Sequence, residues 1–163
     1  MSDTLSVSVQ RGTDGRRHDH FEVPRLPAQT VLDVVTWIQR EADPTLAYRF
    51  ACRVGMCGSC AMTVNGTPRW TCRTRVERAA PDGRLVLEPL RNMPVVKDLV
   101  VDMAPFFAKW TAARGVFSPR DDLGEDFAVV PPATPERRAA DAAIECIGCG
   151  VCYAACDVVA WRP

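Results

Sequence analysis

The eight cysteines of this 163-residue chain fall into two groups, and their spacings constrain the fold more than any other feature. The first group has the spacing C-x4-C-x2-C-x11-C and consists of Cys52, Cys57, Cys60 and Cys72. The second has the spacing C-x2-C-x2-C-x3-C and consists of Cys146, Cys149, Cys152 and Cys156. The first spacing is typical of plant-type [2Fe–2S] proteins, and the second is typical of the bacterial run that binds cubane clusters. Together they predict an electron-transfer protein with more than one iron–sulfur centre.

Eight cysteines could also form disulfides or bind zinc. Residues 1–5 lack the basic and apolar segments of a secretory signal, and cytosolic thiols are kept reduced, so a disulfide framework is disfavoured. Zinc is the stronger alternative because it also binds four thiolates, but structural zinc sites usually pair two C-x2-C knuckles across a longer insert. Neither group has that form. A non-redox structural module held by zinc or disulfides is therefore a weaker hypothesis than an iron–sulfur electron-transfer protein.

Charge and hydropathy narrow the possible partners. The formal net charge is zero, which favours neither nucleic acid nor anionic lipid as a partner. No stretch approaches the roughly 18 apolar residues of a membrane span, so we expect a cytoplasmic chain or one held at a membrane by other subunits. The sequence shows no Ser/His/Asp set or general base, and His18 and His20 are expected to be solvated in a turn. No catalytic residue is predicted.

The first half predicts a small sheet with one helix. Alternating apolar residues over 5–10 predict a strand, polar residues 11–20 a turn, and residues 21–23 a second strand. Thr30 is a candidate cap for a helix that ends before Pro44. Strands are expected over 61–64 and 69–72, on either side of Asn65-Gly66, and over 85–87. This order predicts a β-grasp, [2Fe–2S] ferredoxin-like domain over residues 1–95.

Two glycines lie among the thiols of the first group. A loop that wraps a cluster brings its backbone close to sulfide and often needs positive φ, and Gly55 and Gly58 supply both. Backbone N–H groups of such a loop can donate to the sulfurs. We therefore expect this loop to be shaped by its glycines.

The second half, residues 96–163, predicts a partial α-helical ferredoxin domain, so the fold class is α+β. An apolar stripe over 95–110 has helical spacing with a kink at Pro105, and its aromatic members suit core or subunit contact better than a cofactor site. Residues 112–132 predict an extended surface connection, and Thr134-Pro135-Glu136 begins a helix that runs toward Cys146. Gly148 and Gly150 are expected to allow close approach, as in the first group.

A family resemblance rests on the segment from Ala47 to Cys60, AYRFACRVGMCGSC, followed by Val64-Asn65-Gly66 and Cys72. It resembles the [2Fe–2S] signature of the succinate dehydrogenase/fumarate reductase iron–sulfur subunit family. Some members have Asp at the third ligand position, whereas this chain has Cys60. The resemblance is strongest over residues 46–72 and 144–156, and it covers roughly the first two-thirds of a complete family member.

The resemblance implies roles for the second cysteine group. Cys146, Cys149 and Cys152 would hold a [4Fe–4S] cluster, and Cys156 would be one ligand of a [3Fe–4S] cluster. The family takes the remaining ligands from further downstream, where this sequence has no cysteine, so we expect a truncated or partial form. The chain departs from the family at Asp157, where proline is usual. Trp161 matches a tryptophan of the family's quinone site, with a partly buried C-terminal aromatic as an equally weighted alternative.

The resemblance also implies a function and partners. The chain would relay electrons between an FAD-containing flavoprotein subunit and quinone, in a succinate:quinone or quinol:fumarate oxidoreductase. Membrane-anchor subunits would hold it on the cytoplasmic side of the inner membrane, and the substrate chemistry would lie on the flavin partner. The alternative is a free-standing soluble [2Fe–2S] electron carrier.

Overall fold

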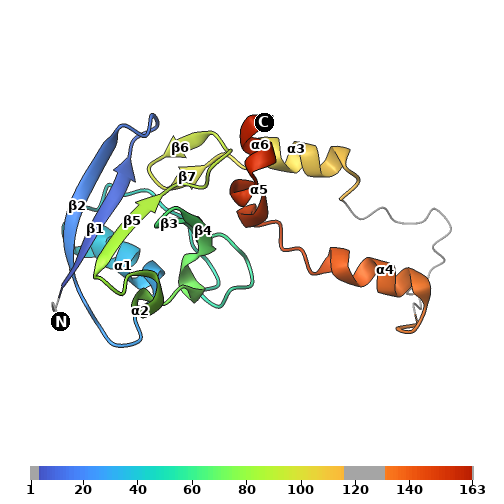
Figure 1. The fold of residues 1–163 in the computed structure, drawn as a ribbon, viewed down its shortest axis with the longest axis horizontal. Helices are drawn as coiled ribbons and strands as arrows, with labels where there is room; N and C mark the ends of the chain where they lie inside the picture. Colours follow the sequence, from blue (N-terminus) through green and yellow to red (C-terminus); the bar gives the residue numbers. More distant parts are fainter. Residues whose placement is uncertain (1–3, 116–130, 163) are drawn as a thin grey trace.

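The structure, a computed structural model, describes residues 4–115 and 131–162. Most of the surface connection predicted over 112–132 therefore lies outside the described residues. In Figure 1 the strands gather at one end of the molecule and the helices α3 to α6 at the other, with the first cysteine group's loop on the side facing the helices.

The sheet has five strands in the order β2-β1-β5-β3-β4. Their bounds are Thr4–Arg11 (β1), Arg17–Pro24 (β2), Ala61–Val64 (β3), Thr67–Trp70 (β4) and Arg84–Glu88 (β5). β1 pairs antiparallel with β2 and parallel with β5, and β3 is antiparallel to both β4 and β5. This mixed sheet with its covering helix is the predicted β-grasp arrangement, and the α+β fold class is confirmed.

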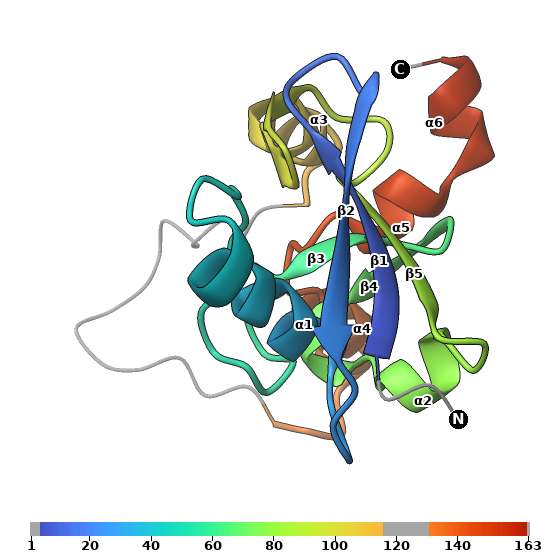
Figure 2. The ribbon, with the colours of Figure 1, turned by 90° about the vertical axis from the view of Figure 1, so that its left-hand side faces the viewer.

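One helix covers a face of this sheet (Figure 2). α1 spans Val31–Trp37 and continues as a wider π-helical turn over Ile38–Ala42. The predicted cap at Thr30 is confirmed, since its hydroxyl accepts from Asp33 N at 3.2 Å while the Asp33 carboxylate accepts from Thr30 N at 2.9 Å. The apolar faces of β1 and α1 pack together in the main core, whose fully buried members include Leu5, Val7, Val9, Val31, Val34, Val35 and Ile38.

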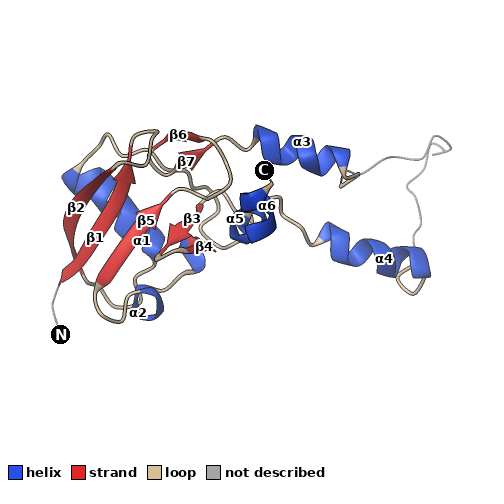
Figure 3. Cartoon of the chain, turned by 45° about the horizontal axis from the view of Figure 1, so that its top comes forward, coloured by secondary structure: helices blue, strands red, loops and turns tan. Residues whose placement is uncertain are grey.

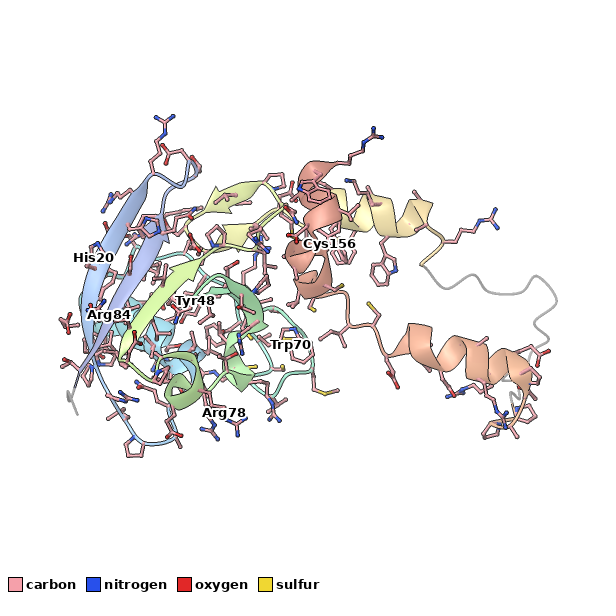
Figure 4. All side chains as sticks on the ribbon, viewed as in Figure 1. His20, Tyr48, Trp70, Arg78, Arg84 and Cys156 are labelled. Carbon is pink, nitrogen blue, oxygen red and sulfur yellow. The ribbon has the colours of Figure 1, made fainter. Side chains whose placement is uncertain are left out.

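The turn predicted over 11–20 is shorter than expected. β2 begins at Arg17, so His18 and His20 lie on a strand rather than in a turn; Figure 4 labels His20 there. β2 pairs with β1 along its whole length, with Gln10 opposite His18 and Ser8 opposite His20. Backbone pairing at a sheet edge does not require alternating apolar residues, so the polar residues 17–20 give no sequence signal of a strand.

The apolar stripe over 95–110 is not one helix. Residues Val95–Lys97 (β6) and Val100–Val101 (β7) form a two-stranded hairpin, and only Ala104–Ala112 (α3) is helical. Pro105 lies in the first turn of α3 and begins the helix instead of kinking it. The hairpin turns at Asp98, whose φ is 50°.

The buried Asp98 explains why a hairpin forms here. Its carboxylate accepts from Gly12 N at 2.8 Å and from Ala47 N at 2.9 Å, and its side chain is 2% exposed. Arg11 Nε lies 3.1 Å from the same carboxylate, although it is not aligned to donate to it. These partners come from two distant segments, so tertiary contacts outweigh the helical spacing.

Short helices complete the chain (Figure 3). A 3-10 turn over Thr71–Arg73 is followed by α2 over Val76–Ala79, and the far end has α4 over Pro135–Ile144, α5 over Val151–Ala155 and α6 over Asp157–Trp161. The predicted start of α4 is confirmed, because Arg137 N donates to the Thr134 hydroxyl at 3.3 Å.

The strand expected over 69–72 ends at Trp70, and Cys72 lies in the 3-10 turn. The domain boundary at residue 95 stays a prediction.

Candidate metal centre

The first cysteine group is assembled by one loop and the hairpin that follows it. Cys52 and Cys57 lie in the loop before β3, Cys60 directly precedes β3, and Cys72 lies in the 3-10 turn after β4. Cys60 and Cys72 are 3% and 7% exposed, whereas Cys52 and Cys57 are half-buried. The structure thus places all four residues of this predicted group in one compact region.

The four thiols form two pairs. Cys52 N donates to Cys57 Sγ at 3.5 Å and Cys57 N donates to Cys52 Sγ at 3.4 Å. Cys60 and Cys72 lie together in a small buried cluster with Leu32. In the described residues, no three His, Cys, Asp or Glu side chains form a group that could hold one metal ion. Two pairs of thiols match the two irons of a binuclear cluster, each of which takes two protein ligands.

Backbone amides converge on the first pair. Cys52 Sγ accepts from Val54 N at 3.4 Å and from Met56 N at 3.2 Å, in addition to Cys57 N. The loop can turn its amides inward because Gly55 and Gly58 have φ values of 78° and 67°. Amides directed at sulfur favour the anionic thiolate that binds iron and lower the energy of the added electron.

The environment shifts two of the thiol pKa values in opposite directions. The Ser59 hydroxyl, with backbone amides of Cys52 and Ser59, lowers the pKa of Cys57 to about 6. Burial, with the hydrogen bond to Cys60, raises the pKa of Cys72 to about 11. Ser59 was not among the predicted site residues, although a hydroxyl between two ligand cysteines is the signal that would have found it.

The second cysteine group is more open. Cys146 and Cys152 are exposed and Cys149 is half-buried in the turn before α5. Cys156 lies at the junction of α5 and α6 (Figure 4). Gly148 and Gly150 have φ values of 63° and 72°, as expected for close backbone approach. The assignment of these four cysteines to particular clusters stays a prediction.

Asn92, which the sequence did not single out, ties the second group to the rest of the chain. Its side-chain amide donates to the carbonyl oxygens of Tyr153 at 3.1 Å and Cys156 at 3.2 Å. Beside it, the fully buried Ala154 packs against Leu90 and Met93. The C-terminal end of α5 is therefore fixed on the segment that follows β5.

The two cysteine groups face a shared cavity of about 240 Å³. Cys57 and Ser59 line it from the first loop, Ile147 and Cys149 from the second, and Phe107 from α3. The loops touch beside it, where Gly58 lies against Cys149.

The aromatic residues of the second half have two different surroundings. Phe106 packs against Tyr153 with ring centroids 5.4 Å apart, which joins α3 to α5 as the expected core contact. Trp161 is 79% exposed, so the alternative of a partly buried C-terminal aromatic is wrong. Its role at a quinone site stays a prediction.

A β-grasp sheet with four thiols and inward-facing amides defines a ferredoxin-like iron–sulfur protein. Residues 4–108 match the family model described as "2Fe-2S iron-sulfur cluster binding domain". The chain therefore belongs to the family of [2Fe–2S] cluster-binding domains.

Curated relatives and a solved structure point in the same direction. The chain is 38% identical to the fumarate reductase iron–sulfur subunit of Mycobacterium tuberculosis, over 88% of this chain and 58% of that protein. It is 35% identical to the mitochondrial succinate dehydrogenase [ubiquinone] iron–sulfur subunit 1 of Oryza sativa, over 82% of this chain and 47% of that protein. A chain of the Mycobacterium smegmatis Sdh1 complex in the apo form superposes with a TM-score of 0.81 and 32% identity, over 98% of this chain and 66% of that one. The chain is thus a homologue of these subunits and spans about half the length of the curated relatives.

Proposed function

We propose that this chain is the electron-transfer part of a succinate:quinone or quinol:fumarate oxidoreductase. It would relay electrons between a flavoprotein subunit and quinone. The observation that carries the proposal is the paired arrangement of four thiols, with backbone amides directed at Cys52 Sγ, in a chain homologous to iron–sulfur subunits of both enzymes. A [2Fe–2S] cluster supplies one-electron carriage when bound.

The donor set of the first group fits such a cluster. Cys52 and Cys57 would hold one iron, and Cys60 and Cys72 the other. The lowered pKa of Cys57 favours its thiolate near neutral pH, and burial of Cys60 and Cys72 excludes water from one side of the site. The amides of Val54 and Met56 would remain donors to sulfur in the loaded site.

The second group would hold further clusters. In this proposal Cys146, Cys149 and Cys152 are ligands of a [4Fe–4S] cluster and Cys156 of a [3Fe–4S] cluster. The remaining ligands would come from outside these 163 residues, in keeping with the partial coverage of the relatives. The exposure of Cys146 and Cys152 suits thiols that another segment must cover.

The flavoprotein would dock over the first cysteine loop. Phe50, Val54 and Met56 are 40%, 60% and 70% exposed there, and the Arg53 guanidinium lies 4.8 Å from the centre of the Phe50 ring. Apolar side chains with a cationic neighbour suit the centre of a protein interface. An electron would then enter beside the more exposed pair, Cys52 and Cys57.

Attachment to a membrane would depend on partner subunits. No helix in the described parts of the chain is long and apolar enough to span a bilayer. Anchor subunits would hold the protein on the cytoplasmic side of the inner membrane, where the exposed Trp161 would contribute to the quinone site.

The proposal is tested by reduction from a flavoprotein. Anaerobic addition of succinate and the purified flavoprotein subunit should produce the EPR signal of the reduced [2Fe–2S] centre. Met56→Glu should slow this reduction while the signal obtained with dithionite is unchanged. Leu26→Glu, at a residue 57% exposed in the loop after β2, is the matched control and should have no effect. Dithionite-reducible protein that the flavoprotein cannot reduce would favour the free-standing soluble carrier.

A further inference from the structure

A glycine of the first cysteine loop lies directly against the second cysteine loop. A Cβ atom placed on Gly58 would lie 2.2 Å from Cys149 Cβ and 3.1 Å from Cys149 Cα. The same atom would lie 3.4 Å from Ile147 Cδ1. Because Cys149 Cα is backbone, a rotamer change cannot relieve this overlap. Gly58 is also buried, so a side chain at this position could not point into solvent instead.

The second loop also packs against two other parts of the chain. A Cβ on Gly148 would lie 3.2 Å from the Trp110 ring and 3.3 Å from the Phe107 ring, so α3 closes one side. A Cβ on Gly150 would lie 2.6 Å from Met93 Cε, and Ala154 behind it is fully buried. Residues 147–150 are thus held between the first loop, α3 and the segment after β5. A side chain at position 58 therefore has to displace Cys149 from the first loop.

We propose that Gly58 is a positioning residue for electron transfer between the two cysteine groups. Its missing side chain lets Cys149 lie against the first loop, and this contact sets the separation of the two sites. The transfer moves one electron from the first site, which is oxidised, to the second, which is reduced, and no bond forms or breaks. The inference rests on the proposed function for its electron-transfer role, whereas the contact stands on geometry alone.

The β3–β4 turn offers a matched control outside the cysteine loops. Gly66 also has positive φ, 76° against 67° for Gly58, so alanine at either position meets the same left-handed backbone. A Cβ on Gly66 would meet no atom within 4 Å. Gly66→Ala therefore reproduces the backbone strain without touching either cysteine loop.

The experiment compares the full chain with Gly58→Ala and Gly66→Ala, each loaded with iron and sulfide. The first readout is hydrogen–deuterium exchange of residues 147–152, which does not require a second cluster. Gly58→Ala should speed exchange there, and Gly66→Ala should leave it at the parent rate. The second readout, made with a downstream cysteine segment added to supply the missing ligands, is the dipolar broadening between reduced clusters in EPR. Gly58→Ala should diminish this broadening and Gly66→Ala should preserve it.

The outcomes separate this inference from the function on which it rests. Equal effects of the two substitutions on exchange, or none from Gly58→Ala, would overturn the positioning role. If the parent chain binds no second cluster even with the missing ligands supplied, the proposed role of the second group fails, and the electron-transfer part of the inference is overturned with it. Unchanged dipolar broadening in Gly58→Ala would also overturn the claim that this contact sets the separation.

Discussion

At the scale of single residues, Cys57 and Cys72 show that the first cysteine group contains thiols with different pKa values. At about pH 7 a thiol whose pKa is about 6 is mostly thiolate, whereas one whose pKa is about 11 stays protonated. Iodoacetamide should therefore alkylate Cys57 before Cys72 in the iron-free full chain. Peptide mass spectrometry over a time course measures both rates.

Ser59→Ala is the informative variant for this prediction. Loss of the hydroxyl, the largest cause of the lowered pKa, should raise the pKa of Cys57 and slow its alkylation near pH 7. At about pH 10, above the usual thiol pKa, the variant and the parent should react alike. An equal rate for Cys57 and Cys72 across this range would show that the loop does not tune its thiols.

Among the elements, the β6–β7 hairpin depends on Asp98. Asp98→Asn should lower the free energy of unfolding by about 1–3 kcal/mol near neutral pH, since it weakens two backbone hydrogen bonds and leaves Arg11 with less compensating charge. Burial alone would raise the pKa of Asp98, but the amides of Ala47 and Gly12, with Arg11, outweigh it and the pKa is lowered. Urea denaturation measures the difference.

The lowered pKa fixes how this difference changes with pH. A carboxyl with a lowered pKa in the folded state stabilises fully above its unfolded pKa of about 4 and loses that contribution as the pH falls through the folded value. The parent and Asp98→Asn should therefore converge in stability at acid pH. Asp14→Asn, an exposed carboxyl that accepts from Arg16 N in a local turn, is the control and should change little. A gap that widened on acidification would contradict this account.

A second element, α5, is fixed at its C-terminal end by Asn92. Asn92→Asp keeps the size of the side chain and tolerates the φ of 65°, but it replaces a donor with a carboxylate facing the carbonyls of Tyr153 and Cys156. We expect a local cost of about 1–3 kcal/mol and faster proteolysis within residues 151–161. The EPR signal of the first cysteine group should be unchanged. Loss of that signal would show that α5 supports the first site directly.

Local patterns predicted some elements and not others. Leu5, Val7 and Val9 alternate and are fully buried, and Thr30 caps its helix, because these signals depend on neighbours in sequence. Residues 95–101 were predicted to be helical because their apolar spacing suits a helix, but Asp98 is held by Gly12 and Ala47, far away in the chain. A sequence pattern carries no information on such partners.

For the whole molecule, the cysteine spacing identified the members of each group but not how the groups meet. The contact of Gly58 with Cys149 depends on how α3 and the segment after β5 carry the second loop back to the first. That path follows from packing of Met93, Phe107 and Trp110, which no spacing rule encodes.

The division of labour in the proposed complex also gives a prediction for the whole molecule. The chain supplies thiols and donors for electron transfer, and the succinate chemistry is assigned to the flavoprotein. The purified chain should show no succinate-dependent dye reduction, and adding the flavoprotein subunit should restore it. The chain with Cys57→Ala is the control, because it lacks one iron ligand and should remain inactive with the flavoprotein present. Succinate-dependent activity of the chain alone would contradict the assignment of the substrate chemistry to the flavoprotein.

The central claim is that Cys52, Cys57, Cys60 and Cys72 hold a [2Fe–2S] cluster within the β-grasp half. The most direct measurement is the metal content and EPR spectrum of the full chain purified without oxygen, before and after exposure to air. The account predicts a rhombic S = ½ signal on reduction, which is lost in Cys57→Ala. It also predicts about two irons per molecule retained in air, because only the first group offers four thiolates to one cluster, whereas Cys156 is assigned to a different cluster from Cys146, Cys149 and Cys152. A colourless protein that holds stoichiometric zinc and gives no signal would contradict it.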